Sequence, residues 1–418
     1  MSDAVDARIR AFVSGHCANA EAFLAALVRV PSDNPPGDCA PHAAATATLL
    51  EGLALPVTRL PVPEALVRAN GMISCVNLLV RIPLGSGRGP VIALNAHGDV
   101  VPPGLGWTAD PYGAEVRDGV MLGRGVAVSK SDFATYAFAA LALRDAAAHG
   151  APLDGVVELH FTYDEEVGGA IGPAWLLAEG HTRPDYAISA GFSYAITTAH
   201  NGCLHVEVEV RGRSGHAAEP SKGVDALEAT TGILADLYAS RSALAGIASG
   251  VTGIGPPTLV VGLIDGGINT NVVPDLVHFR IDRRIVPSES AAEVETALVR
   301  GIESSAARWP GISVRIRRIL LAQPFVPIDG QQRLVDALAR RAGEVFGATP
   351  PARGVPIYTD ARHYSAAGVP TVLYGAGPRT LEEANGHRAD ERLRLSDLHG
   401  ATEVVALTLA DLLTPHGG

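Results

Sequence analysis

The sequence predicts an α/β protein in which a mixed sheet flanked by helices carries an inserted ferredoxin-like unit. Apolar, strand-like runs alternate with helical patterns in residues 1–199 and again in residues 321–418, as in a sheet covered by helices. Between them, residues 200–320 change to half-exposed strands in the order β-α-β-β-α-β. We therefore expect one larger domain, built from both ends of the chain and interrupted by a second domain.

The elements of the larger domain follow from apolar periodicity. Phe23, Leu24, Leu27 and Val28 form the apolar stripe of a helix. Short apolar runs predict strands and longer alanine-rich or periodic runs predict helices: strands at residues 76–82, 91–94, 156–161 and 371–374, and helices at residues 43–50 and 132–148. Nearly continuous apolar strands indicate that the sheet is largely buried.

Alternating polarity identifies the strands of the inserted unit. Leu204, Val206, Val208 and Val210 alternate with polar residues, which is typical of a strand with one exposed face. Residues 277–281 alternate in the same way. The remaining elements are strands at residues 258–263 and 312–319 and helices at residues 224–238 and 291–304.

Composition and charge exclude several classes of protein. An apolar fraction of 47% with 18% charged residues is typical of a globular chain and not of a disordered one. The net charge of −11 argues against a nucleic-acid partner, which requires a concentrated basic surface. The four cysteines form no C-x-x-C pair, and we find no signal-peptide pattern and no apolar run near the roughly 20 residues of a membrane span. We expect a soluble cytoplasmic protein with no membrane partner.

A histidine and a carboxylate follow the strand expected at residues 91–94. His97 and Asp99 lie two residues apart, at a strand end where side chains of an open α/β sheet face a cleft. The histidine can bind a metal ion while Asp99 orients its ring. Taken alone the pair is weak evidence, because H-x-D occurs by chance and such a histidine is often structural.

Three consecutive carboxylates, Asp164, Glu165 and Glu166, follow the strand expected at residues 156–161. Adjacent carboxylates repel one another, so they require a cation, a shared proton or exposure to solvent. An isolated acidic run is usually a solvated loop, but its place at a strand end favours a functional role. His387, in a glycine-rich region near the carboxyl end of the chain, is a third candidate.

Together these clusters resemble the M20 metallopeptidases, a family that includes glutamate carboxypeptidases, aminoacylases, acetylornithine deacetylases and succinyl-diaminopimelate desuccinylases. The resemblance covers nearly the whole chain, and its motifs are specific through their order and spacing. They are AHGDVVP (residues 96–102), W-x-x-D-P-Y (107–112), GRG with a following lysine (123–130), TYDEEVGG (162–169), GRSGHAAEP (212–220), NVVP (271–274), D-x-R-x-x-P (282–287) and TDAR (359–362). The inserted unit is similar to the dimerisation or lid domain of that family.

The resemblance implies roles for five residues of the larger domain, which becomes the catalytic domain. His97, Glu166 and His387 would bind metal, and Asp99 would orient the His97 ring. Glu165 would be the general base that acts on metal-activated water.

The resemblance also implies roles for three residues of the inserted domain. His216 would contact the developing oxyanion of the substrate, usually from the partner subunit, so we expect a homodimer or a higher homo-oligomer. Asn271 and Arg284 would bind polar groups of a small-molecule substrate. The alternative for His216 is that it only caps local structure.

The chain departs from the family at one metal position. Members typically hold two metal ions, bridged by an aspartate in the stretch after GRG, but here that position is Val128. A further carboxylate ligand is replaced by Gly191. We therefore expect one divalent transition metal (Mn, Zn, Fe or Co) per chain, held by His97, Glu166 and His387. Alternatively, Asp132 takes over the bridging role.

The expected activity is that of a metal-dependent hydrolase that cleaves a carbon–nitrogen bond. The substrate would be an N-acyl amino acid or a dipeptide whose carboxylate is held by Arg284. A less common branch of the family, typified by 5-nitroanthranilate aminohydrolase, replaces an aromatic amino group with water, and the reduced metal site permits this alternative. A catalytically inactive binding protein is disfavoured, because Glu165, Glu166 and His387 are all retained.

Overall fold

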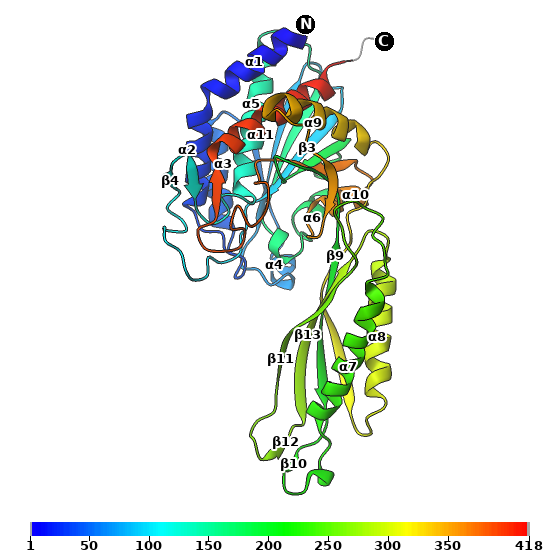
Figure 1. The fold of residues 1–418 in the computed structure, drawn as a ribbon. Helices are drawn as coiled ribbons and strands as arrows, with labels where there is room; N and C mark the ends of the chain where they lie inside the picture. Colours follow the sequence, from blue (N-terminus) through cyan, green and yellow to red (C-terminus); the bar gives the residue numbers. More distant parts are fainter. Residues whose placement is uncertain (1, 416–418) are drawn as a thin grey trace. The chain divides into compact units, whose positions relative to one another are not determined.

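The computed structural model describes residues 2–415, and its contacts divide the chain into two compact units (Figure 1). Unit 1 comprises residues up to 198, residues 327–353 and residues from 359 onwards, so it contains both ends of the chain. Unit 2 comprises residues 199–326 and 354–358. Residues 354–358 lie within the range predicted for the larger domain. In the structure they belong to unit 2, where the Gly354 amide donates to the Thr252 carbonyl at 2.8 Å.

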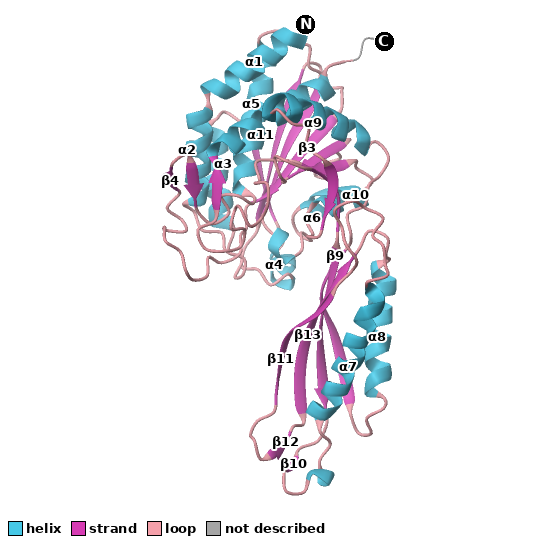
Figure 2. Cartoon of the chain, viewed as in Figure 1, coloured by secondary structure: helices cyan, strands magenta, loops and turns pink. Residues whose placement is uncertain are grey.

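Unit 1 is built on an eight-stranded sheet in the order β1-β2-β6-β3-β7-β16-β8-β15 (Figure 2). The strands are β1 (Val57–Pro61), β2 (Val76–Leu84), β3 (Val91–His97), β6 (Gly155–Thr162), β7 (Tyr186–Ser189), β8 (Ile196–His200), β15 (Ala352–Val355) and β16 (Thr371–Leu373). The central strands β6, β3, β7 and β16 are parallel, whereas β1 with β2, β2 with β6 and β8 with β16 are antiparallel. The mixed sheet confirms the predicted fold class.

Helices cover both faces of this sheet. Alternate residues of β3 point to opposite faces: Ile92 and Leu94 join the main core, whereas Ala93 packs with Tyr364 in a smaller cluster. The main core includes α1 (Ser2–Gly15), α2 (Cys17–Val28), α3 (Ala40–Gly52), α4 (Glu64–Ala69), α5 (Lys130–Ala148), α9 (Gln331–Phe346) and α11 (Leu395–Leu413). The smaller cluster packs α6 (Pro173–Ala178) and α10 (Ala361–Ala366) against the other face.

Helix α5 is the centre of the main core. It is almost entirely buried, because its many alanines let neighbouring elements approach closely. Phe133 in its first turn stacks on Phe161 of β6 with ring centroids 3.9 Å apart, and meets Tyr163 edge-on. These contacts fix the start of α5 beside the end of β6, where the acidic run begins.

A small three-stranded sheet joins two distant parts of unit 1. It has the order β17-β5-β4, from β4 (Glu115–Arg117), β5 (Val120–Leu122) and β17 (Arg392–Arg394). The antiparallel pairing of β5 with β17 brings the segment after residue 122 next to the segment before residue 392. Those two segments contain the GRG motif and His387, respectively.

Unit 2 has the ferredoxin-like order β9-α7-β11-β13-α8-β14, with an antiparallel sheet in the order β11-β13-β9-β14. Its elements are β9 (Gly202–Arg211), α7 (Ala226–Leu244), β11 (Leu259–Gly266), β13 (Leu276–Ile285), α8 (Ala291–Ala306) and β14 (Ser313–Ala322). The apolar residues of the alternating strands face the two helices, as the sequence predicts. A two-residue pair, β10 (Gly215–His216) with β12 (Val272–Val273), was not predicted.

Within residues 2–415, no single helix is long and apolar enough to cross a membrane. Helices α1 and α2 meet that criterion together by length and composition, with a bend of 54° between them. Six residues of α2 are buried within the core of unit 1.

Candidate metal centre

His97 is the last residue of β3, and its side chain is buried at the carboxyl end of the sheet. The Nδ1 atom lies 2.9 Å from the Asp99 carbonyl oxygen. Because a carbonyl only accepts hydrogen bonds, Nδ1 carries the proton in the neutral ring, and the Nε2 lone pair remains for a cation. Nε2 lies 4.0 Å from a carboxylate oxygen of Glu165.

The surroundings of His97 favour positive charge. Burial alone would lower the pKa of the imidazole, but the side-chain carboxylate of Asp99, 3.3 Å from Nδ1, and the charges of Glu165 and Glu166 outweigh it and raise the pKa well above its usual value. The imidazole of His97 therefore binds a second proton readily when it does not bind a metal ion. Metal ions and protons would compete for the ring.

Asp99 connects the end of β3 to the acidic run. Its carboxylate is fully buried, and it accepts the backbone amides of Glu165 at 3.3 Å and of Glu166 at 3.1 Å. Asn34 donates its side-chain amide to the same carboxylate at 3.0 Å. Asn34 was not predicted from the sequence, since nothing in its local pattern points to Asp99.

Glu165 and Glu166 lie in a short 3-10 turn, Glu165–Val167, that directly follows β6. Ligand atoms of His97, Glu165 and Glu166 all lie within 4.8 Å of one another. Burial, followed by the repulsion of Asp99, raises the pKa of Glu165, and burial with the charge of Glu165 raises the pKa of Glu166 well above its usual value. The turn is therefore suited to bind a cation.

The TDAR segment (residues 359–362) helps to hold the turn that carries Glu165 and Glu166 in place. Arg362 and His363 both contact the Gly168 carbonyl, with His363 Nε2 at 3.2 Å. Gly169 has a φ of +66°, and a Cβ there would lie 2.2 Å from Oδ1 of Asp360. Among the described residues, neither oxygen of buried Asp360 has a hydrogen-bond partner. Burial, with the charges of Asp164 and Glu165, raises the pKa of Asp360 well above its usual value.

His387 lies on the loop between β16 and β17. Its Nε2 atom is 3.6 Å from Oε1 of Glu166, and its side chain is 63% exposed. The structure thus brings His387 beside one member of the group formed by His97, Glu165 and Glu166. Two imidazoles and two carboxylates form a donor set that suits Zn, Mn, Fe or Co.

At Gly191, where the family resemblance implies a carboxylate ligand, the backbone is closely packed. A Cβ on Gly191 would lie 2.7 Å from the Tyr374 amide nitrogen, so the backbone leaves no room for a carboxylate side chain. Asp132 accepts the Ala376 amide at 2.7 Å and also interacts with the backbone of Gly191. Burial raises the pKa of Asp132 to about 7. The alternative in which Asp132 bridges two metal ions is therefore disfavoured, because its carboxylate already binds backbone amides.

The three candidates in the inserted segment belong to unit 2. His216 is exposed on β10, and its Nδ1 accepts the Ala218 amide at 3.0 Å, which leaves Nε2 for other partners. The Asn271 carbonyl accepts the Ala217 amide at 3.0 Å, so Asn271 and His216 lie beside each other at the antiparallel β10–β12 pair. Arg284 on β13 forms a two-point ion pair with Asp282, at 3.0 and 3.1 Å. The sequence did not reveal this partner.

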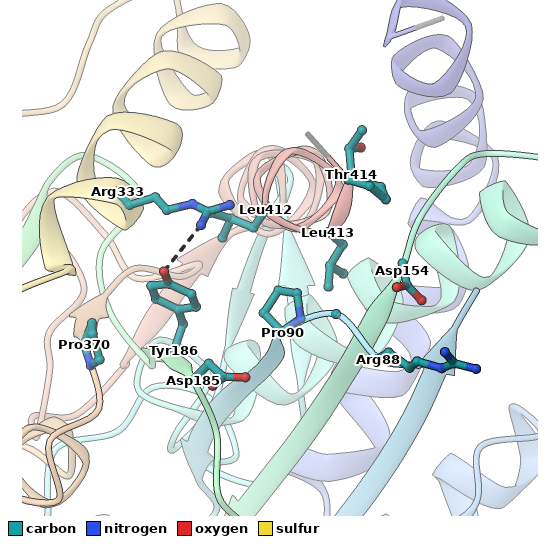
Figure 3. A pocket seen from close by; sticks show the side chains of 12 residues that line it. Arg88, Pro90, Asp154, Asp185, Tyr186, Arg333, Pro370, Leu412, Leu413 and Thr414 are labelled. Atoms are coloured by element: carbon teal, nitrogen blue, oxygen red, sulfur yellow. Dashed lines mark hydrogen bonds between the residues drawn. The ribbon is translucent and has the colours of Figure 1, made fainter. Parts of the chain in front are cut away.

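A cavity of about 620 Å³ in unit 1 lies away from this chemistry (Figure 3). It is lined by Pro90, Tyr186 and Pro370, which stand at the starts of β3, β7 and β16. In Figure 3, Arg333 reaches over to the Tyr186 hydroxyl, at 3.5 Å. Ligands of open α/β sheets bind outside the carboxyl ends of the strands, and His97 stands at that opposite end.

Comparisons with known proteins agree with one family. The model of peptidase family M20/M25/M40 matches residues 93–411. A succinyl-diaminopimelate desuccinylase of Gluconacetobacter diazotrophicus is 28% identical, over 93% of this chain and 95% of its own length. An acetylornithine deacetylase of Proteus mirabilis is 29% identical, over 86% of each. The crystal structure of a dinuclear metal-binding M20 peptidase from Bacillus subtilis superposes with a TM-score of 0.67 at 18% identity, over 96% of this chain and 99% of that one.

Substitutions of Glu165 and Glu166 should affect turnover and metal binding differently. We expect Glu165→Gln to lower turnover about 10²- to 10⁴-fold and to leave metal binding largely intact, because the amide keeps its shape but cannot accept a proton. Glu166→Gln should instead weaken metal retention. Steady-state kinetics and metal titration of both variants check this, each serving as the control for the other, and the reverse pattern would exchange the two roles.

Proposed function

Because the chain belongs to peptidase family M20/M25/M40, hydrolases that act on amide and peptide bonds, we propose that it cleaves the C–N bond of a small carboxylate-bearing amide. The substrate class is N-acyl amino acids or dipeptides. The relatives named as a desuccinylase and a deacetylase support the N-acyl class. The single observation that carries the proposal is the convergence of His97, Glu165 and Glu166 ligand atoms within 4.8 Å at the end of the sheet.

We assign the metal ligands to His97, Glu166 and His387, with one divalent cation per chain. His97 offers Nε2 because Asp99 holds the proton on Nδ1. The 3.6 Å between His387 Nε2 and Glu166 Oε1 is short enough for one ion to contact both atoms. The cation would supply a Lewis acid that polarises the scissile carbonyl and lowers the pKa of water.

Glu165 is the proposed general base. Its backbone amide is held by Asp99, which leaves the carboxylate free to face the same space as His97 Nε2. Burial raises the pKa of Glu165, so the carboxylate accepts a proton from the attacking water more readily than an exposed one. The protonated carboxyl then delivers that proton to the leaving nitrogen.

Arg284 and Asn271 are the proposed contacts of the substrate's polar groups. Asp282 engages Nε and Nη2 of Arg284, and we assign the Nη1 donors to a substrate carboxylate. Asp282 then keeps the guanidinium in one orientation, which reduces the entropy lost when substrate binds. The Asn271 side chain is exposed next to β12, which pairs with the strand β10 that carries His216.

We propose a dimer that forms through unit 2. Strand β11 is an edge of the four-stranded sheet, and it exposes Val260, Leu263 and Ile264 at 51, 46 and 49%. An apolar edge strand pairs readily with another chain, and a two-fold axis would use the same patch on both subunits. His216 would then reach the partner's acidic turn and stabilise the developing oxyanion.

A substrate panel tests the proposed reaction. Protein loaded with Mn²⁺ or Zn²⁺ is assayed against N-acyl amino acids, dipeptides and anthranilates, with Glu165→Gln as the inactive control. We expect turnover of the first two classes. If only the anthranilates react, with release of ammonia, the reaction is aromatic deamination and not amide hydrolysis. Metal binding without turnover of any substrate would favour a binding protein.

The metal content should be close to one ion per chain. Val128 offers no ligand atom, and the backbone around Gly191 has no space for one. We expect elemental analysis of metal-saturated, gel-filtered protein to give a ratio near one, with a dinuclear relative treated identically as the control. A reproducible ratio of two would contradict the single site.

Subunit mixing tests whether His216 acts across the dimer. Glu165→Gln and His216→Ala homodimers should each be nearly inactive. If the histidine acts in trans, exchanged heterodimers contain one site that combines an intact Glu165 with an intact partner His216, and activity should return. Exchange is verified with differently tagged subunits. No recovery after complete exchange would place the action of His216 within its own subunit, or outside the reaction.

A further inference from the structure

The loop that carries His387 needs an anchor outside itself. Three of its non-glycine residues, Asn385, His387 and Asp390, have left-handed φ angles of 51, 61 and 54°. Asn, His and Asp tolerate this region better than other residues with a Cβ, but three such positions within residues 385–390 still favour a loop whose shape depends on surrounding contacts. His97, in contrast, is the last residue of β3, and the backbone amide of Glu166 is held by Asp99.

Arg124 of the GRG motif contacts the part of this loop that follows His387. Its Nη1 atom donates to Oε2 of Glu391 at 2.6 Å, and its Nη2 donates to the carbonyl of Arg388, the residue after His387, at 3.3 Å. Nη2 also donates to the Pro103 carbonyl at 3.1 Å. The guanidinium lies over the Trp107 ring, 5.3 Å from its centroid, which adds a cation–π contact.

Glu391 completes the link from the other side. Its second carboxylate oxygen accepts the Ala127 amide at 3.1 Å, and its backbone carbonyl accepts the Gly123 amide at 2.9 Å. The side chains of Arg124 and Glu391 are only 1 and 2% exposed, so water does not compete for these bonds. The pair therefore fastens residues 123–127 to residues 388–391 next to the small β5–β17 sheet.

We propose that Arg124 and Glu391 are positioning residues that hold His387 where it can bind the metal ion, an inference that rests on the proposed metal site. A buried ion pair adds little net stability, because desolvation offsets the attraction, but it fixes the relative register of the segments it joins. The two-point geometry matters here: a lysine at position 124 keeps the charge but cannot reach Glu391 and the Arg388 carbonyl together. Neither residue touches the reacting atoms.

The test compares two ion pairs of unit 1. Arg124→Lys and Glu391→Gln alter the pair beside His387, whereas Arg341→Lys and Asp411→Asn alter a pair that joins α9 to α11, in which the arginine side chain is 4% and the aspartate side chain 22% exposed. For each variant, the Kd for Zn²⁺ is measured by competition with a chelator, and thermal unfolding is measured without metal. Amide hydrogen exchange reports local opening of residues 384–390.

We expect the Zn²⁺ Kd to rise about 10- to 100-fold in Arg124→Lys and Glu391→Gln, as is common when an outer partner of a metal ligand is lost. Exchange in residues 384–390 should become faster in the same two variants. The control variants should lower the unfolding temperature while leaving both the Kd and the exchange of this loop at wild-type values.

Unchanged Zn²⁺ affinity in folded Arg124→Lys or Glu391→Gln would overturn the positioning role. If both fail to fold, Trp107→Leu decides the question, because it removes the ring beneath the guanidinium, together with the Trp107 Nε1 hydrogen bond to the Pro103 carbonyl, and should shift the Kd in the same direction by a smaller factor. Failure of the wild-type protein to bind Zn²⁺ would instead contradict the proposed metal site, so the two failures are distinguishable.

Discussion

The buried carboxylate of Asp99 accepts hydrogen bonds from Asn34 and from the backbone amides of Glu165 and Glu166, and it lies 3.3 Å from the Nδ1 atom of His97. A charge this deeply buried is unfavourable unless several donors surround it, so these donors must stay in place for unit 1 to fold as it does. The same requirement aligns the ends of the parallel neighbours β3 and β6. The buried carboxylate of Asp99 therefore links the end of β3 to the turn that carries Glu165 and Glu166.

Burial and mutual repulsion of the carboxylates favour positive charge at the site. Asp164, Glu165, Glu166 and Asp360 all have raised pKa values, mainly because they are buried, and further because they repel one another or Asp99. Positive charge near the turn is limited: Arg362 clamps the Gly168 carbonyl, and His97 is stabilised as a cation. A divalent ion would offset this repulsion, so its binding free energy would also contribute to the stability of unit 1.

The segment around Gly191 is closely packed. Gly191 lets its backbone approach Leu373 and Tyr374 too closely for any side chain, and Asp132 binds the backbone of this region. The close backbone approach and the hydrogen bonds of Asp132 support each other. Restoring a carboxylate at residue 128 alone would not reopen the space around Gly191.

The sequence by itself determined the features that depend on local periodicity and on residue type. Alternation in residues 204–210 and 277–281 predicted unit 2, because a strand with one buried face imposes a period of two. The places of His97 and of the acidic run followed from the apolar strands that precede them. The family resemblance added the assignment of roles, which the fold alone does not specify.

Only the tertiary structure decided which distant residues support those roles. Asn34 lies 65 residues from Asp99, and Arg124 lies 267 residues from Glu391. A contact of this kind leaves no periodic trace, since it depends on how β3, β6 and the β5–β17 pair are arranged in space. The contacts of Asp132 with backbone amides and of Arg284 with Asp282 could not be predicted from the sequence for the same reason. A side chain's chemistry can be read from the sequence, but its partner is set by folding.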